Sequence, residues 1–177
     1  MTEKEHKINK KDKQESRHVL SLVLDDEAGA LGRVVGLFSS RGYNIHSLTV
    51  SEMDSQKKLS RITIVTSAPL HVIEHIKALL ERLIPVYKVR DLTTEGAFVE
   101  KSLLLIKVSI KDKRSELLNL AEQYEALQVD ATDSTFIFQL TDISSKLDEF
   151  VEIMRPYGII ETARTGVTAM ARGSDGF

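Results

Sequence analysis

The sequence predicts an α+β fold of two tandem ferredoxin-like units, each with the order β-α-β-β-α-β. The main observation is that strand-like apolar runs and helix-like apolar faces alternate in the same order twice. A second is the stretch 92–100, which separates the two copies as a linker. A third is that 177 residues, 42% hydrophobic and 28% charged, are typical of a globular chain with one domain or two small ones.

The first unit is expected in residues 18–91. Its strand-like runs are 18–24, 44–51, 59–66 and 84–91. Its first helix carries an apolar face with the spacing i, i+3, i+4, i+7, formed by Leu31, Val34, Val35 and Phe38. Gly42 stands where a helix end favours a residue with positive φ. Pro69 opens the second helix, whose apolar face is formed by Ile73, Ile76, Leu80 and Leu83.

The second unit is expected in residues 101–173. Its strand-like runs are 101–110, 127–132, 135–140 and a last one around 157–166. Its helix faces contain Leu117, Leu120, Ala121 and Tyr124, and then, from near Ser144, Leu147, Phe150, Val151 and Met154. Each unit buries one sheet face under two helices and leaves the other face and the edges open. Because units of about 75–80 residues are marginal alone, we expect a dimer.

The two ends of the chain are predicted to be tails, at 1–17 and 174–177. Residues 1–17 mix six basic with four acidic side chains and lack the apolar core of a secretory signal, so we expect a disordered segment. A net charge of −2 gives no reason to expect a nucleic-acid partner. No apolar run approaches the ~20 residues that span a bilayer, so no membrane is expected and the predicted location is cytoplasmic.

Two motifs raise the possibility of other chemistry. Gly29, Gly32 and Gly36 follow G-x-x-G-x-x-x-G rather than the dinucleotide pattern G-x-G-x-x-G. We interpret Gly29 as a turn residue and the other two as positions of close packing. The stretch "HVIEH" (71–75) matches an inverted zinc-protease pattern, which leaves a small metalloenzyme as one alternative.

That alternative lacks support elsewhere in the sequence. A catalytic zinc needs a third protein ligand, and no later segment offers one; there is also no cysteine. We therefore expect exposed histidines at 71 and 75, and packing or edge roles for His18 and His46 within strands. No serine–histidine–acid arrangement is evident, so no catalytic residue and no metal site are predicted.

The remaining candidate for a ligand-binding site is the turn within "LDDEAGALGRVVGLFSSRGYNIHSL" (24–48). A strand that ends in a glycine turn and feeds a helix presents backbone N–H groups and the positive end of the helix dipole. Such a turn suits a small carboxylate. Asn44, at the start of the next expected strand, adds both a donor and an acceptor. The residues alone leave open both a binding site and a simple turn with its cap.

A family resemblance bears on this choice. "LDDEAGALGRVVGLFSSRGYNIHSLTVS" with "LSRITIVT" resembles the ACT domain of the small regulatory subunits of acetolactate synthase, also called acetohydroxyacid synthase. "VEIMRPYGIIETARTGVTAMARG" resembles the end of the same proteins. The likeness spans 18–173. It implies an ACT domain at 18–91 for effector binding and dimerisation, and a regulatory-subunit domain at 101–173.

The resemblance also implies a non-catalytic role. Members of this family bind the large catalytic subunit, raise its activity and make it sensitive to feedback by valine or another branched-chain amino acid. Thiamine diphosphate, magnesium and FAD are then expected on the large subunit and no cofactor on this chain. The effector is expected between two ACT domains, at the glycine turn of one chain and near the next strand of its partner. The implied effector-binding residues are Asp26, Gly29, Ala30, Leu31, Asn44 and Ile45.

Two departures from the family pattern stand out. Valine-sensitive members commonly have asparagine at the position of Asp26, so effector affinity or choice is expected to depend on this residue. In the second unit, "YEALQVDAT" (124–132) replaces a stretch that often holds an arginine–glycine pair, which bears on contact with the large subunit. The alternative within the same class is a free-standing ACT sensor for another enzyme, against which the "ETARTG" segment argues.

Overall fold

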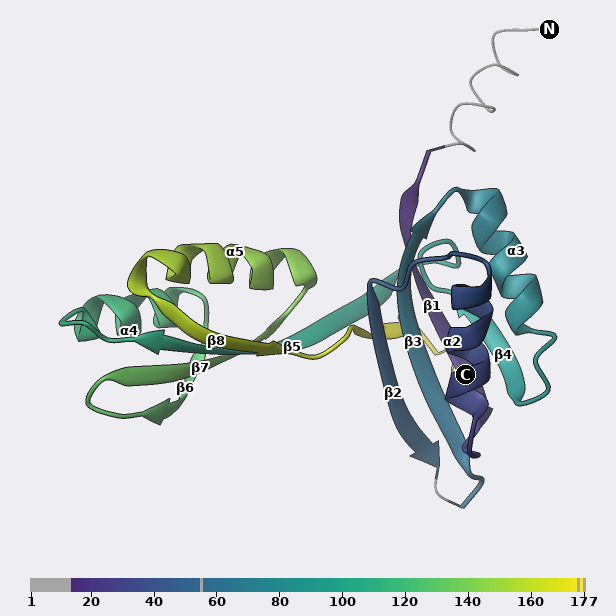
Figure 1. Cartoon of the computed structure of the whole chain (residues 1–177), viewed down its shortest axis with the longest axis horizontal. Coiled ribbons are helices and arrows are strands. Elements are labelled where there is room, and N and C mark those ends of the chain that lie inside the picture. The colour runs from purple at the N-terminus through teal and green to yellow at the C-terminus, as the bar shows by residue number, and fades with distance from the viewer. Residues whose placement is uncertain (1–13, 55, 175, 177) are drawn as a thin grey trace, which may run out of the picture. The chain divides into compact units, whose positions relative to one another are not determined.

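The computed structural model describes residues 14–54, 56–174 and 176, and its chain forms two compact units (Figure 1). The first unit comprises the chain up to Val99 together with the segment from Ala169 onward. The second comprises Glu100–Thr168. Of the expected tails, residues 1–13, 175 and 177 lie outside the described residues.

The first unit is a four-stranded antiparallel sheet in the order β2-β3-β1-β4. Figure 1 shows α2 and α3 on the same side of this sheet. The elements are β1 (Ser16–Asp25), α2 (Ala30–Ser40), β2 (Ser47–Asp54), β3 (Leu59–Ala68), α3 (Leu70–Leu80) and β4 (Val86–Asp91). This is the βαββαβ order that the apolar pattern predicts.

The core of the first unit lies between the sheet and its two helices. Alternate residues of the central strands point toward the helices, as period-2 side-chain direction requires. The buried cluster includes Leu20, Leu22, Leu24, Ile62, Ile64, Val34, Phe38, Ile73, Ile76 and Leu80. Leu83 lies beyond the end of α3 and still packs against this cluster.

On the helix-free face of the first sheet, the central strands β1 and β3 are also buried, contrary to expectation. Val19 is 0% exposed and Val65 is 4% exposed, although both point away from the helices. Ser21 and Thr63, on the same face, are buried too. A strand covered on both faces reads as a continuous apolar run, which "HVLSLVL" nearly is.

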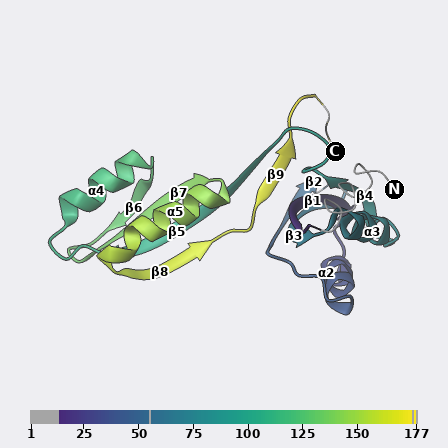
Figure 2. The same ribbon diagram turned by 90° about the horizontal axis from the view of Figure 1, so that it is seen from above.

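The second unit repeats the architecture with sheet order β6-β7-β5-β8, and a further strand, β9, pairs with β5. Figures 1 and 2 show α4 and α5 over the same face of this sheet. Its core alternates along β5 and β7, where Leu104, Ile106, Phe136 and Phe138 are buried. The elements are β5 (Phe98–Ser109), α4 (Arg114–Gln123), β6 (Leu127–Ala131), β7 (Thr135–Asp142), α5 (Ser144–Met154), η1 (Arg155–Tyr157), β8 (Ile159–Arg164) and β9 (Thr168–Ala171).

Several element boundaries differ from the sequence expectation, and the starts of three strands are the clearest cases. The strand expected at 44–51 begins at Ser47, because the preceding residues return the chain from α2, with the Tyr43 N–H bonded to Phe38 O. β1 begins at Ser16, two residues inside the expected tail, since it pairs with the end of β3. β5 begins at Phe98, so the last three residues of the expected linker are strand.

The C-terminal segment was not expected to leave the second unit. β9 has no counterpart in the predicted elements, and from Ala169 onward the chain belongs to the first compact unit. The Arg172 N–H donates to Ala97 O at 2.9 Å, which holds this segment to the start of β5. A four-residue strand leaves too little periodicity for the pattern to reveal it.

Candidate functional site

The glycine turn joins the end of β1 to α2 and is held by backbone hydrogen bonds. The Asp25 N–H donates to Pro85 O at 2.8 Å and the Asp26 N–H to Lys58 O at 2.7 Å, which ties the turn to the loops before β4 and β3. Gly29 has φ +88°, a left-handed conformation that favours glycine. No heavy atom would lie within 4 Å of a Cβ placed there, so the space in front of the turn is open.

The start of α2 offers hydrogen-bond donors to an anion. Gly29 is the N-cap residue and no side chain caps the helix, nor does an acidic side chain occupy its first turn. The first N–H groups of a helix lack intrahelical partners and carry the positive end of its dipole. A small carboxylate is therefore the ligand class that this turn suits best.

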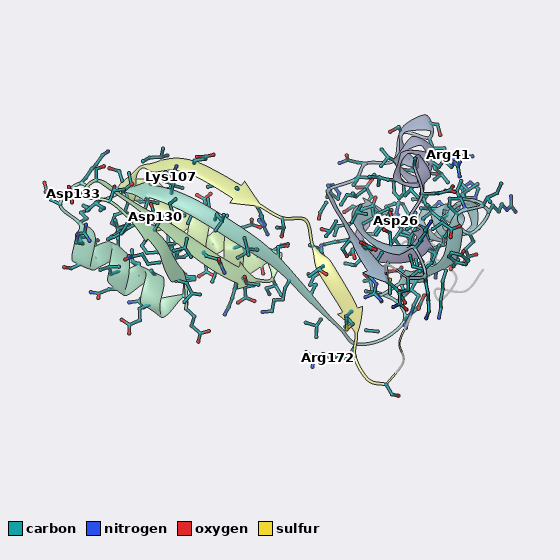
Figure 3. The ribbon with its side chains drawn as sticks, turned by 90° about the horizontal axis from the view of Figure 1, so that it is seen from below. Asp26, Arg41, Lys107, Asp130, Asp133 and Arg172 are labelled. Atoms are coloured by element: carbon teal, nitrogen blue, oxygen red, sulfur yellow. The ribbon has the colours of Figure 1, made fainter. Side chains whose placement is uncertain are left out.

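The three acids of the turn differ in their contacts. The Tyr87 hydroxyl donates to Asp25 Oδ1 at 2.7 Å, and this bond to a carboxylate raises the pKa of Tyr87. Arg33 Nη1 lies 2.9 Å from Glu27 Oε1 in an exposed ion pair. The Asp26 carboxylate is exposed and has no hydrogen-bond or ion-pair partner among the residues described (Figure 3). Asp26 is thus the acid of this turn that is available to a ligand.

One chain does not bring all the predicted effector residues together. Gly29 and Leu31, which is 40% exposed, lie at the N-terminal end of α2. Asn44 follows the other end of that helix; 11 residues at 1.5 Å each separate the ends by about 16 Å. Ala30 is buried in the core, so only its backbone faces the turn, while Ile45 packs half-buried against the same core.

The region around Asn44 is polar and partly fixed. Asn44 O accepts a hydrogen bond from Thr66 Oγ1 at 2.7 Å, and Asn44 Nδ2 lies 3.3 Å from His46 Nδ1. His46 is exposed and precedes β2 rather than lying within it. The Asn44 side chain is exposed, so its amide remains accessible to a ligand or a second chain.

The other glycines of the motif have different roles from those predicted. A Cβ at Gly32 or Gly36 would meet nothing within 4 Å, so the close packing expected there is wrong. Both positions are exposed on α2. Gly42 has φ +69°, which confirms the expected left-handed residue after the helix.

The two histidines of the zinc-protease-like motif lie on α3. His71 and His75 are exposed on α3, as predicted. Over residues 14–54, 56–174 and 176, no group of three or more histidine, cysteine, aspartate or glutamate side chains is arranged to hold a metal ion.

A serine–histidine–aspartate chain is present, which no sequence motif predicts. Ser16 Oγ lies 2.9 Å from His18 Nε2, and His18 Nδ1 lies 2.7 Å from Asp91 Oδ2. His18 and Asp91 are both buried, and the Thr93 N–H donates to Asp91 Oδ1. The group joins the start of β1 to the end of β4. The spacing of Ser16 and His18 places them on one strand face, but only the topology reveals their contact with Asp91.

The "ETARTG" segment forms the end of β8 and the residues after it, and it contacts α5 and β5 of the second unit. Arg164 donates to Asp148 Oδ1 of α5 and to Ser144 O at the start of that helix. Thr165 exchanges two bonds with Leu103, one through its backbone N–H and one through its hydroxyl. The segment therefore fixes the end of β8 against both α5 and β5.

No helix in the described part of the chain is long and apolar enough to cross a membrane.

The comparisons with known proteins agree with this geometry. Residues 20–88 match the family model described as an AHAS small subunit-like ACT domain, so the first unit is an ACT domain. Residues 101–173 match the model for the small subunit of acetolactate synthase. The chain belongs to the family of acetolactate synthase small subunits, and the family together with its ACT domain implies a regulatory role.

Individual relatives cover nearly the whole chain. The acetolactate synthase isozyme 3 small subunit of Escherichia coli is 42% identical over 159 residues, covering 89% of this chain and 96% of the relative. The acetolactate synthase small subunit of Bacillus subtilis is 37% identical over 164 residues, covering 89% and 92%. The crystal structure of the small subunit from Thermotoga maritima aligns with a TM-score of 0.83 at 30% identity, over 90% of this chain and 99% of that one.

Proposed function

We propose that this chain binds the large catalytic subunit of acetolactate synthase, raises its activity and makes it sensitive to feedback by valine or another branched-chain amino acid. The observation that carries the proposal is the uncapped glycine turn before α2, in an ACT domain of this family. Relatives named small subunits of acetolactate synthase support a larger partner. Thiamine diphosphate, magnesium and FAD would then belong to that cytoplasmic partner.

The effector site is proposed to form between two chains. Gly29 and Asn44 lie about 16 Å apart along α2, too far to contact one amino acid together. A second copy of the N-terminal unit would supply the missing half. β2, an edge strand with exposed Val50 and Met53, is available for pairing. Light scattering at micromolar concentration should report about twice the 19.8 kDa chain mass, whereas a stable monomer would remove this site.

The proposed function is tested by co-purification with the large subunit, followed by assays of that subunit's activity with and without valine. Gly29→Asp places bulk and a negative charge where the effector carboxylate is expected. This variant should still activate the large subunit and no longer respond to valine. Gly36→Asp is the matched control, because Gly36 is exposed on the same helix with free space for a side chain. Loss of both activation and response in Gly29→Asp would instead identify a purely structural turn.

A substitution of Asp26 tests how the effector is oriented in the site. An ionised aspartate can only accept hydrogen bonds, so near the helix N-terminus it competes with the effector carboxylate for the same donors. Asp26→Asn is expected to strengthen valine binding about tenfold, about 1.4 kcal/mol, in calorimetric titration at pH 7.5. Asp133→Asn, an exposed acid of the second unit (Figure 3), should change nothing. Weaker binding in Asp26→Asn would make Asp26 the partner of the ammonium group.

A further inference from the structure

The start of β1 carries the serine–histidine–aspartate chain, and effector binding gives this group no role. Ser16 and His18 lie on one face of β1, and Asp91 is the last residue of β4. Ser16 Oγ lies 2.9 Å from His18 Nε2, and His18 Nδ1 lies 2.7 Å from Asp91 Oδ2. The group lies at the opposite end of β1 from the glycine turn.

The hydrogen bonds determine which nitrogen of His18 carries the proton. A carboxylate only accepts hydrogen bonds, so His18 donates its Nδ1–H to Asp91 and its Nε2 is left as an acceptor. Nε2 therefore accepts the hydroxyl proton of Ser16. A serine that donates to a histidine, which is oriented in turn by a carboxylate, is the arrangement that activates a serine nucleophile.

The histidine and the aspartate are held in place, whereas the serine is open to solvent. His18 is 3% exposed and Asp91 is 1% exposed, while Ser16 is exposed. The Asp91 carboxylate also accepts from the Thr93 N–H at 3.0 Å, and the Thr93 hydroxyl accepts from the Val19 N–H at 3.0 Å. A reagent in solvent can therefore reach Ser16 Oγ while its base stays fixed.

The start of α3 lies near this serine. Ser16 pairs with Ala68, the last residue of β3, and α3 begins two residues later at Leu70. No side chain caps α3 and no acidic side chain lies in its first turn. The positive end of the helix dipole would therefore stabilise the negative oxygen that forms when the serine hydroxyl adds to an acyl group.

We propose that Ser16 is a nucleophilic site that takes an acyl group from small activated esters, with His18 as its general base and Asp91 as the residue that positions His18. Ser16 Oγ attacks the acyl carbon while its proton passes to His18 Nε2. The new O–C bond forms as the bond to the leaving oxygen breaks, and the proton on Nε2 then passes to that oxygen. A positioned general base contributes about 10²–10⁴-fold to such a step.

Acylation of the full chain by p-nitrophenyl acetate, quenched early with acid and mapped by peptide mass spectrometry, tests the proposal. The chain carries its own controls, since Ser115 and Ser145 are exposed serines of the second unit. The acetyl ester should form at Ser16 at least about a hundredfold faster than at either control, and His18→Gln should abolish this preference. Comparable rates at the three serines of the unsubstituted chain would overturn the assignment, whatever His18→Gln does to folding.

The absence of cysteine from the sequence allows a separate test of His18 and Asp91. Ser16→Cys and Ser115→Cys each give a chain with a single thiol. A neighbouring histidine lowers the pKa of a thiol, so at pH 6 iodoacetamide should alkylate Ser16→Cys at least about tenfold faster than Ser115→Cys. Asp91→Asn, added to Ser16→Cys, should remove this advantage, because the imidazole loses its fixed orientation. Equal rates in the two single-thiol variants would show that the bond between Ser16 and His18 is only structural, and an unchanged rate with Asp91→Asn would overturn the role of Asp91.

Discussion

In the ACT unit β1 buries seven consecutive residues, whereas the equivalent strand of the second unit, β5, alternates between buried and half-buried positions. The two strands occupy equivalent places in the strand order of their sheets, although β5 pairs in addition with β9. Their helix-facing residues are alike. The difference lies on the other face, where Val19 and Ser21 are buried while Leu103 and Leu105 are only half-buried.

The second unit keeps its helix-free face partly open. Lys107 Nζ lies 3.4 Å from Glu161 Oε2 across this face, beside a shallow cavity of about 130 Å³ lined in part by Leu105, Ile137 and Ala163. In the register Lys107 and Asp130 lie on either side of Ile137, and Figure 3 shows both at the same end of the unit. One repeat is therefore covered on two faces and the other on one, although both follow the same element order.

The largest loss of unfolding free energy is expected in the helix-facing cores, where the two units are most alike. Ile73 of α3 and Leu147 of α5 are both fully buried. Truncation to alanine should cost about 2–5 kcal/mol of unfolding free energy in each case, through lost apolar contact and the cavity left behind. Hydrogen exchange by mass spectrometry should show the loss mainly in the substituted unit. A small cost at one position only would mean that the two cores are not equivalent.

A second pair of variants should distinguish the helix-free faces of the two units by the loss of stability that each variant causes. Val65→Asn buries an amide on the covered face of β3 and should cost about 2–3 kcal/mol. Ile137→Asn places the same amide on the half-open face of β7, where water reaches it, and should cost less than about 1 kcal/mol beyond its lost apolar contact. Urea unfolding followed by hydrogen exchange in each unit measures both. Equal costs would show that the second face is also covered in solution.

Much of this architecture could be predicted from the sequence, because side-chain periodicity determines which face of each element is apolar. The start of α5 at Ser144 and the face formed by Leu147 and Phe150 are confirmed. The burial of both faces of β1 could not be predicted, since the apolar pattern of the strand does not show which segment covers its helix-free face. The late start of β2 was missed because Ile45 extends the strand-like run, although the paired register of β2 with β3 begins only at Ser47.

For the candidate site, the sequence located the turn but not its surroundings. The positive φ of Gly29 follows from the glycine between a strand and a helix. The separation of Gly29 from Asn44 depends on the length of α2 and on the return of the chain at its far end. Asp91 comes from another strand, so its contact with His18 depends on sheet order.

A third prediction concerns the buried pair His18 and Asp91, which joins β1 to β4 in the ACT unit. Asp91→Ala removes the acceptor of both His18 and the Thr93 N–H, and should cost about 1–3 kcal/mol because buried donors lose their partner. Ser16→Ala is the matched control: Ser16 is exposed, so water can replace its bond to His18 and the cost should be slight. Thermal unfolding of both variants is the measurement. An equal, large cost for Ser16→Ala would show that the whole chain of three residues acts as one unit.

The smallest loss of stability is expected at a partly exposed ion pair of the second unit. Lys101 Nζ lies 2.6 Å from Asp142 Oδ1, and this bond, together with the Ile143 N–H and Lys146, lowers the pKa of Asp142 from 3.8 to about 2. Because Lys101 is 44% exposed, water screens the pair, and Asp142→Asn should cost less than about 1 kcal/mol at pH 7. Asp133→Asn, an exposed acid of the same unit, should cost nothing measurable.

The pH dependence of the unfolding free energy shows whether the ionised form of Asp142 is the stabilising one. A carboxyl whose folded pKa is lowered stabilises the fold above its unfolded pKa, and the contribution is lost as pH falls through the folded value. The difference in unfolding free energy between the unsubstituted chain and Asp142→Asn should therefore be constant from pH 7 to about 5 and shrink between about 4 and 2. Urea unfolding at pH 7, 5, 3 and 2 tests this. A difference that grows toward pH 2 would mean that the protonated carboxyl, rather than the ion pair, stabilises this end of β7.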